Sequence, residues 1–226
     1  MKLKMCARLL LLAAALGFTA CSESDGTEDT EYTNWQARNN DYFTQTLRQA
    51  AAEVATAKAA YGDSWEEHCD WRVYRSYAKS ATAEASASDS IAVRVLHKGT
   101  GSGYPYYTDS VRVNFIGRLM PNSLSTDLES RTKGLMFAYT GTVKDSAVVF
   151  SPEYCSPALL AVSNSVEGFT TALMRMRIGD RWRVYIPQAL GYGSSATTTI
   201  PAYSTLIYDM ELKAYYRKGV VAGPWQ

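Results

Sequence analysis

The sequence predicts an α+β protein with an antiparallel sheet that one short helix crosses. Three patterns support this class. Several segments between residues 91 and 216 alternate apolar and polar side chains with a period of two, which is typical of strands. Residues 166–176 have helical spacing over a short length. A longer helical pattern, 35–61, precedes them, so a helical extension comes before a domain in which strands dominate.

Residues 1–20 have the features of a secretory signal of the lipoprotein type. A basic start precedes an apolar run from Leu9 to Leu16, which is too short to span a bilayer. Small residues stand directly before Cys21, as in a bacterial lipoprotein processing site. We therefore expect diacylated Cys21 to anchor the protein outside the cytoplasm of a bacterium, with the outer membrane favoured and surface exposure left open. The alternative is an ordinary secretion signal with an incidental cysteine.

The extension is expected to have three parts after the signal. Residues 21–32 are acidic without a bulky apolar core and predict a disordered tether, either a plain spacer or a surface-export signal. Residues 33–80 predict a helix from Trp35 to Tyr61 that stops at Gly62, and then a short strand. The apolar face of this helix suits packing against the domain or a second copy in a homodimer, and contains Phe43, Leu47, Ala50, Val54, Ala57 and Tyr61. Residues 81–90 are rich in alanine and serine and predict a linker.

The domain is predicted over residues 91–216, before a tail at 217–226. Strands are expected around residues 91–96, 111–117, 182–186 and 205–213, and a helix from Val166 to Met176. Val113, Trp182, Leu206 and Leu212 are expected to be core residues. Residues 118–148 are polar and mixed, and predict a long irregular loop or an inserted hairpin.

Composition excludes several kinds of chemistry. Removal of the leader turns the formal net charge of +1 into −2, which gives no reason to expect nucleic-acid binding. The two histidines, His68 and His97, lack the neighbouring cysteines and carboxylates of a metal site, and no nucleophile elbow is present. We expect no metal and no cofactor. Cys69 and Cys155 leave a disulfide and two free thiols as open alternatives.

Five stretches in order carry a resemblance to a known family. They read VLHKGTG at 95–101, VRVNFIG at 111–117, VEGF at 166–169, IPQALGYG at 186–193 and IPAYSTLIYDMEL at 200–212. Together they resemble the FKBP-type peptidyl-prolyl cis-trans isomerases over roughly residues 88–216. The resemblance implies a half-barrel, in which a strongly bent antiparallel sheet wraps around one short helix.

The resemblance also implies a site between the helix and the concave face of the sheet. Tyr192 would donate a hydrogen bond to a substrate carbonyl, and Phe169 would form the floor. The catalytic positions that it implies are Phe115, Phe150, Phe169, Tyr192 and Tyr208. The substrate-binding positions that it implies are Ser151, Leu160, Val166 and Ile200. Expected ligands are proline-containing or unfolded protein segments and, from the family alone, macrolide inhibitors.

Two departures from the family pattern leave alternatives open. Ser151 stands where the family usually has an aspartate, and serine cannot supply that charge. The connection between Gly117 and Phe150 is much longer than usual. We therefore weigh an active isomerase against a catalytically weak FKBP-like chaperone or peptide-binding module. A third interpretation makes the inserted segment 118–148 the working surface and the half-barrel its scaffold.

Overall fold

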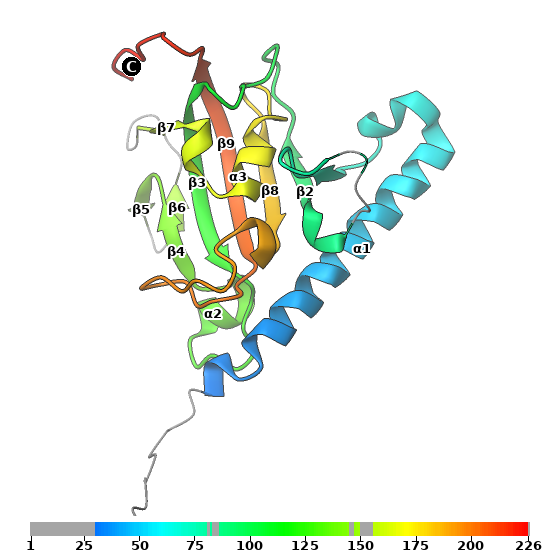
Figure 1. Ribbon diagram of the computed structural model, residues 1–226, viewed down its shortest axis with the longest axis vertical. Coiled ribbons are helices and arrows are strands. Elements are labelled where there is room, and N and C mark those ends of the chain that lie inside the picture. Colours follow the sequence, from blue (N-terminus) through cyan, green and yellow to red (C-terminus); the bar gives the residue numbers. More distant parts are fainter. Residues whose placement is uncertain (1–29, 81, 83–85, 145–146, 150–155, 226) are drawn as a thin grey trace, which may run out of the picture. The chain divides into compact units, whose positions relative to one another are not determined.

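The computed structural model describes residues 30–80, 82, 86–144, 147–149 and 156–225 (Figure 1). The α-helices of these residues are α1 Trp35–Tyr61, α2 Leu128–Lys133 and α3 Glu167–Leu173. The strands are β1 Trp71–Arg75, β2 Ser90–His97, β3 Ser110–Leu119, β4 Met136–Tyr139, β5 Thr142–Lys144, β6 Ala147–Val149, β7 Ala158–Ala161, β8 Arg181–Ile186 and β9 Leu206–Tyr216. The 3-10 helices are η1 Thr30–Tyr32, η2 Gly62–Glu67, η3 Ala87–Asp89, η4 Val162–Asn164 and η5 Gln188–Leu190.

Seven strands form one sheet with the order β1-β2-β8-β9-β3-β4, and β7 pairs with the other end of β3 (Figure 1). Every pairing in it is antiparallel. β5 and β6 form a separate hairpin. The predicted α+β class with an antiparallel sheet is therefore confirmed. The sheet also includes β1, so the strand of the extension pairs directly with the first strand of the predicted domain.

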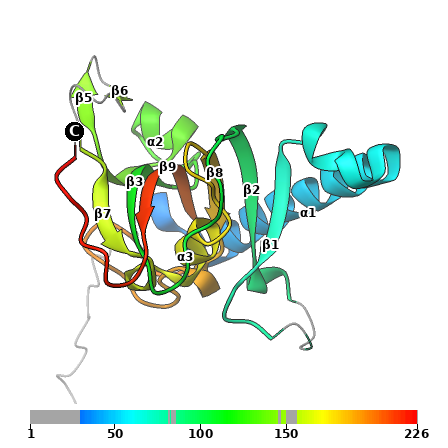
Figure 2. The same ribbon diagram turned by 90° about the horizontal axis from the view of Figure 1, so that it is seen from above.

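Alternation along β8 separates the two faces of the sheet. Val184 and Ile186 are fully buried, and Ile186 packs against Gly168 of α3. Tyr185 points to the other face, where its ring lies 6.5 Å from that of Tyr42 in α1. The two helices therefore pack against opposite faces of the sheet, as Figure 2 also shows. The predicted core positions are buried, with Val113, Trp182, Leu206 and Leu212 at most 5% exposed.

Helix α1 has the predicted bounds. It ends at Gly62, whose φ of 53° lies in the left-handed region that glycine adopts most readily. The predicted apolar face packs against the sheet at Phe43, Ala50 and Ala57, which are buried. Tyr61 departs from that prediction, because its side chain is exposed and stacks on His68 at 3.9 Å between ring centroids.

The inserted segment is more ordered than an irregular loop. Leu119 still belongs to β3, and α2 and β4 follow it. Asp127 caps the amino terminus of α2 by accepting a hydrogen bond from the Ser130 amide at 2.6 Å. β4 pairs with β3, and the hairpin of β5 and β6 fits the second of the two predicted alternatives.

Some sequence predictions lie outside the described residues. They concern the signal, Cys21 and residues 21–29 of the acidic tether, as well as Cys155 near the end of the insertion. The end of the predicted tether is not disordered, because Thr30–Tyr32 form η1 and the Glu31 carbonyl accepts a hydrogen bond from the Asn122 side chain at 2.9 Å. Cys69 carries a buried free thiol. Across the described part of the chain, no helix is both long and apolar enough to cross a membrane.

Candidate active site

Three aromatic rings meet on the α3 face of the sheet. Phe115 comes from β3, Phe169 from α3 and Tyr208 from β9. The centroid of the Tyr208 ring lies 4.9 Å from that of Phe169 and 6.0 Å from that of Phe115, and the Phe115 and Phe169 rings are 5.8 Å apart. All three pairs meet edge to face, which is a favourable arrangement of aromatic quadrupoles. The structure thus brings together three of the five predicted catalytic positions.

A fourth ring, Phe137 of β4, was not predicted. Its centroid lies 5.5 Å from that of Tyr208, at an interplanar angle of 87°. Gly117 makes room for both rings, because a Cβ at this position would lie 2.6 Å from Phe137 and 2.8 Å from Tyr208. The only sequence signal for Phe137 was an aromatic residue in a short apolar run, in a segment whose pairing the sequence did not reveal.

The insertion also fixes the backbone of Phe115. The Phe115 amide donates to the Thr140 hydroxyl at 2.8 Å, and the Thr140 amide donates back to the Phe115 carbonyl at 2.9 Å. Thr140 follows β4, so the same segment that supplies Phe137 holds a predicted site residue in place. The insertion is therefore part of the wall of the ring cluster.

The predicted aliphatic positions border the cluster. Val166 directly precedes α3 and is half-buried, while Ile200 is 4% exposed. Leu160 is half-buried on β7 and pairs with Val111, four positions before Phe115 on β3. All three pack with the rings in one apolar core.

Two tyrosines contribute polar groups. Burial raises the pKa of Tyr208, and the neighbouring Tyr192 raises it further, so the two side chains interact electrostatically. Tyr192 is 39% exposed and follows η5 in the loop between β8 and β9. The Tyr192 side chain is thus partly open to solvent, whereas the hydroxyl of Tyr208 remains protonated at neutral pH. Phe150 and Ser151, also predicted for this site, lie outside the described residues.

The region that contains the cluster matches a known family. Residues 104–213 match the model of the FKBP-type peptidyl-prolyl cis-trans isomerases. This segment belongs to that family. The FKBP segment begins after β2, although β2 pairs with β8 inside the same sheet.

Curated relatives match over a similar length. The chain is 33% identical over 128 residues to the FKBP-type 22 kDa peptidyl-prolyl cis-trans isomerase of Escherichia coli K12, covering 56% of this chain and 50% of that protein. It is 34% identical over 118 residues to the macrophage infectivity potentiator of Trypanosoma cruzi, covering 52% and 48%. The chain thus spans about half the length of these relatives.

A solved structure of a peptidyl-prolyl cis-trans isomerase from Pseudomonas syringae pv. tomato is also similar. It shares 22% sequence identity and has a TM-score of 0.44, and the match covers 77% of this chain and 96% of that chain.

The described part of the site suits recognition more than covalent chemistry. Its side chains within the FKBP segment are aromatic rings, aliphatic groups and the phenols of Tyr192 and Tyr208. Such a surface can hold a planar apolar ring by packing and orient a carbonyl by one hydrogen bond.

Proposed function

We propose that the protein is a peptidyl-prolyl cis-trans isomerase that acts on X-Pro bonds by non-covalent catalysis. The observation that carries this proposal is the convergence of Phe115, Phe169 and Tyr208 within a segment of the FKBP family. The rings receive the pyrrolidine ring of proline, and Tyr192 donates to a substrate carbonyl. Val166, Ile200 and Leu160 line the apolar border, and Phe150 completes it.

The proposed mechanism follows from the nature of the bond. Amide resonance opposes rotation with a barrier of roughly 18–20 kcal/mol and places partial charge on the carbonyl oxygen and the nitrogen. Water stabilises that charge separation, so a dry aromatic surface lowers the energy needed to twist the bond. A surface that fits the twisted imide better than either planar isomer adds differential binding. A millionfold acceleration requires roughly 8 kcal/mol from these effects together.

Proline-limited refolding of a test protein measures this activity. The full chain should accelerate the slow phase, and Phe169→Ala should abolish most of the acceleration because the floor of the ring cluster is lost. Tyr106→Ala is the matched control, since Tyr106 is 61% exposed and outside the cluster. If the folded parent protein gave no acceleration above the uncatalysed rate, the proposed activity would be rejected.

Ser151 favours a second candidate function, a catalytically weak chaperone or peptide-binding module. In this case the rings capture proline-containing segments but do not accelerate rotation, because the aspartate usual in the family is missing. Ser151→Asp distinguishes the candidates. A large gain in rate from an inert parent supports the binding module, and little change in an active parent supports the isomerase.

We also propose that the protein works outside the cytoplasm, held to a bacterial membrane by lipid on Cys21. The support is the apolar run at Leu9–Leu16 and the small residues before Cys21. Metabolic labelling with a radioactive fatty acid should mark the parent protein but not Cys21→Ser. Release of the unlabelled variant from the membrane fraction would agree with the anchor, whereas equal labelling of both proteins would contradict it.

Two binding properties complete the proposal. Macrolide inhibitors should compete for the ring cluster, which inhibition of the refolding activity would reveal.

A homodimer through α1 would have to use the side of the helix that does not pack on the sheet, because Phe43, Ala50 and Ala57 are already buried against it. Light scattering at several protein concentrations measures the oligomeric state.

A further inference from the structure

A second cleft, distinct from the aromatic cluster, has a volume of about 690 Å³. Its walls come from η2, β1, β2 with the segment after it, the segment that follows α3, and β8. The side chains that matter for its chemistry are Trp65, Tyr74, Lys98, Tyr104, Arg175 and Trp182. None of the described catalytic and substrate-binding positions of the proposed isomerase lines it. Its size is in the range of sites that hold ligands of several hundred daltons.

The wall of this cleft contains a buried hydrogen-bond donor without a partner. Trp182 is 5% exposed, and its indole Nε1 has no hydrogen-bond partner. A buried polar group without a partner destabilises the fold, and native proteins avoid it in most places. Indole nitrogen can only donate, so a ligand that satisfies it must bring an acceptor.

Two further donors lie next to Trp182. The rings of Tyr74 and Trp182 stack with their centroids 5.8 Å apart, and the guanidinium carbon of Arg175 lies 5.7 Å from the centroid of Tyr74. Burial raises the pKa of Tyr74 to about 12, so its hydroxyl keeps its proton at neutral pH. Arg175 is exposed, and its guanidinium lies over the ring of Tyr74 in a cation–π contact.

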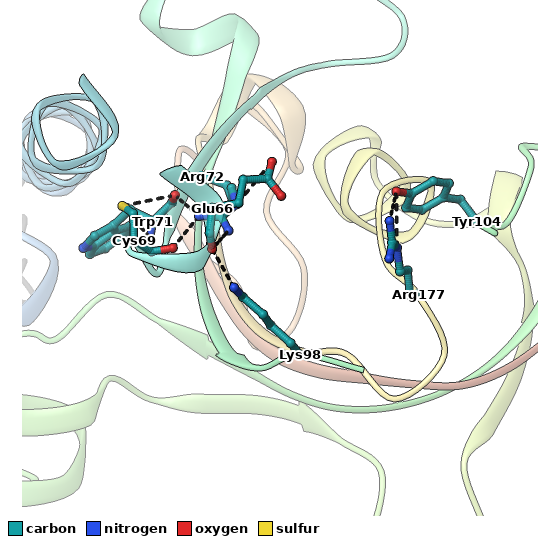
Figure 3. A network of polar contacts seen from close by, with 7 residues as sticks. All are labelled: Glu66, Cys69, Trp71, Arg72, Lys98, Tyr104 and Arg177. Carbon is teal, nitrogen blue, oxygen red and sulfur yellow. Dashed lines mark hydrogen bonds and ion pairs between the residues drawn. The ribbon is translucent and has the colours of Figure 1, made fainter. Parts of the chain in front are cut away.

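The charged groups of the inner wall other than Arg175 already have partners. Asp180 accepts hydrogen bonds from the amides of Gly99 and Arg177, one on each carboxylate oxygen, both at 2.7 Å. Arg72 donates to the carbonyls of Cys69, Trp71 and Glu66. Figure 3 shows Lys98 reaching the Glu66 carbonyl and Arg177 bound to the Tyr104 hydroxyl. The groups of the inner wall that can still bind a ligand are therefore hydrogen-bond donors, and the ligand must bring an acceptor.

The rim limits which anions fit. Asp63, Glu66 and Glu67 are exposed along η2 and line the same cleft. A densely charged polyanion such as nucleic acid would meet repulsion from these carboxylates. A ligand with one carboxylate on a neutral, partly apolar frame meets much less of this repulsion and can still use the stacked rings.

We propose that this cleft is a second binding site, which holds a short peptide segment through a single carboxylate. The carboxylate lies between Arg175 and Tyr74. The Trp182 N–H, which has no partner, is the third donor to it on this wall. The peptide backbone extends over Trp65 and Tyr104. The protein then contacts a polypeptide at two places, one that recognises proline and one that recognises an acidic side chain.

Isothermal titration of the full chain with a proline-free peptide, N-acetyl-Ala-Asp-Ala-Ala amide, tests this site. We expect saturable binding that weakens about tenfold when asparagine replaces the aspartate of the peptide. Trp182→Phe keeps the ring but removes the donor, and Arg175→Gln removes an exposed charge, so each should weaken binding several-fold. Equal binding by both variants and the parent, or no binding at all, would overturn the proposal.

Controls separate this site from the proposed isomerase. Phe169→Ala should leave binding of the acidic peptide unchanged, and Trp182→Phe should leave the refolding activity unchanged. A loss of peptide binding in Phe169→Ala would assign the peptide to the ring cluster and overturn the second site. If inorganic phosphate bound the cleft as tightly as the peptide and displaced it, the cleft would be a general anion site. This result would overturn the peptide assignment. Failure of the isomerase assay alone would leave the outcome of the titration intact.

Discussion

At the scale of single residues, Gly117 controls how closely the rings of the site can approach. A methyl group here would lie 2.6 Å from a ring carbon of Phe137 and 2.8 Å from one of Tyr208, closer than real contacts allow. Gly117→Ala should therefore displace these rings and destabilise the protein by about 1–3 kcal/mol. We also expect most of the isomerase activity to be lost. Urea unfolding and the refolding assay measure the two effects.

The matched control for Gly117 is Gly223. A Cβ there meets nothing within 4 Å, so Gly223→Ala should change neither stability nor activity. Should Gly117→Ala prove as stable and as active as the control, the close packing of Phe137 and Tyr208 would not matter for the site.

The ring cluster shows which site residues a sequence can reveal. Phe115, Phe169 and Tyr208 stand in motifs that resemble the FKBP family. The resemblance alone was therefore enough to predict that they share one site. Phe137 stands in no such motif, and its position depends on the pairing of β4 with β3, a contact between segments that only folding brings side by side. Ser151 and Phe150 stay predictions, because they lie outside the described residues.

At the scale of elements, Asn39 joins α1 to the sheet. Its side-chain oxygen accepts a hydrogen bond from the Thr205 amide at 2.7 Å, just before β9, and its side-chain nitrogen donates to the Trp35 carbonyl at 2.7 Å. Asn39→Ala leaves the buried Thr205 amide without a partner. We expect a loss of about 1–3 kcal/mol in the free energy of unfolding, measured in urea.

The neighbouring Asn40 provides the control for this contact. Asn40 is exposed on the same helix, so Asn40→Ala should change stability by less than about 0.5 kcal/mol. Equal effects of the two substitutions would mean that α1 contributes through helix propensity and not through its bond to Thr205.

The insertion should affect activity through Thr140. Thr140→Val keeps the shape of the side chain but removes the hydroxyl that accepts from the Phe115 amide. Because one hydrogen bond contributes about 1 kcal/mol, we expect an approximately fivefold loss in refolding activity. Thr56→Val, at an exposed position of α1, is the control and should be fully active. Full activity of Thr140→Val would mean that the insertion does not position Phe115.

Prediction of elements succeeded where local signals were strong. The repeat of apolar residues and Gly62 defined both ends of α1, because helix periodicity and a left-handed cap are local properties. The same signals could not show that Tyr61 turns outward onto His68, or that β4 joins the sheet. Both depend on contacts made by other segments.

At the scale of the whole molecule, buried tyrosines link stability to alkaline pH. Burial raises the pKa of Tyr42 and of Tyr74 to about 12, and it also raises that of Tyr208. An unfolded tyrosine loses its proton near pH 10, so above that pH the unfolded chain binds fewer protons than the folded one. The stability that these groups contribute is present below about pH 10 and is lost as the pH rises toward their folded pKa values.

The urea midpoint should therefore fall as the pH rises from about 10 toward 12, with the slope of unfolding against urea unchanged. Tyr42→Phe combined with Tyr74→Phe removes two of the titrating groups and should reduce the fall. Tyr106→Phe, at a position 61% exposed, should behave like the parent, because an exposed phenol ionises almost equally in both states. A fall of the same size in the double variant and the parent would show that these two phenols do not drive alkaline unfolding.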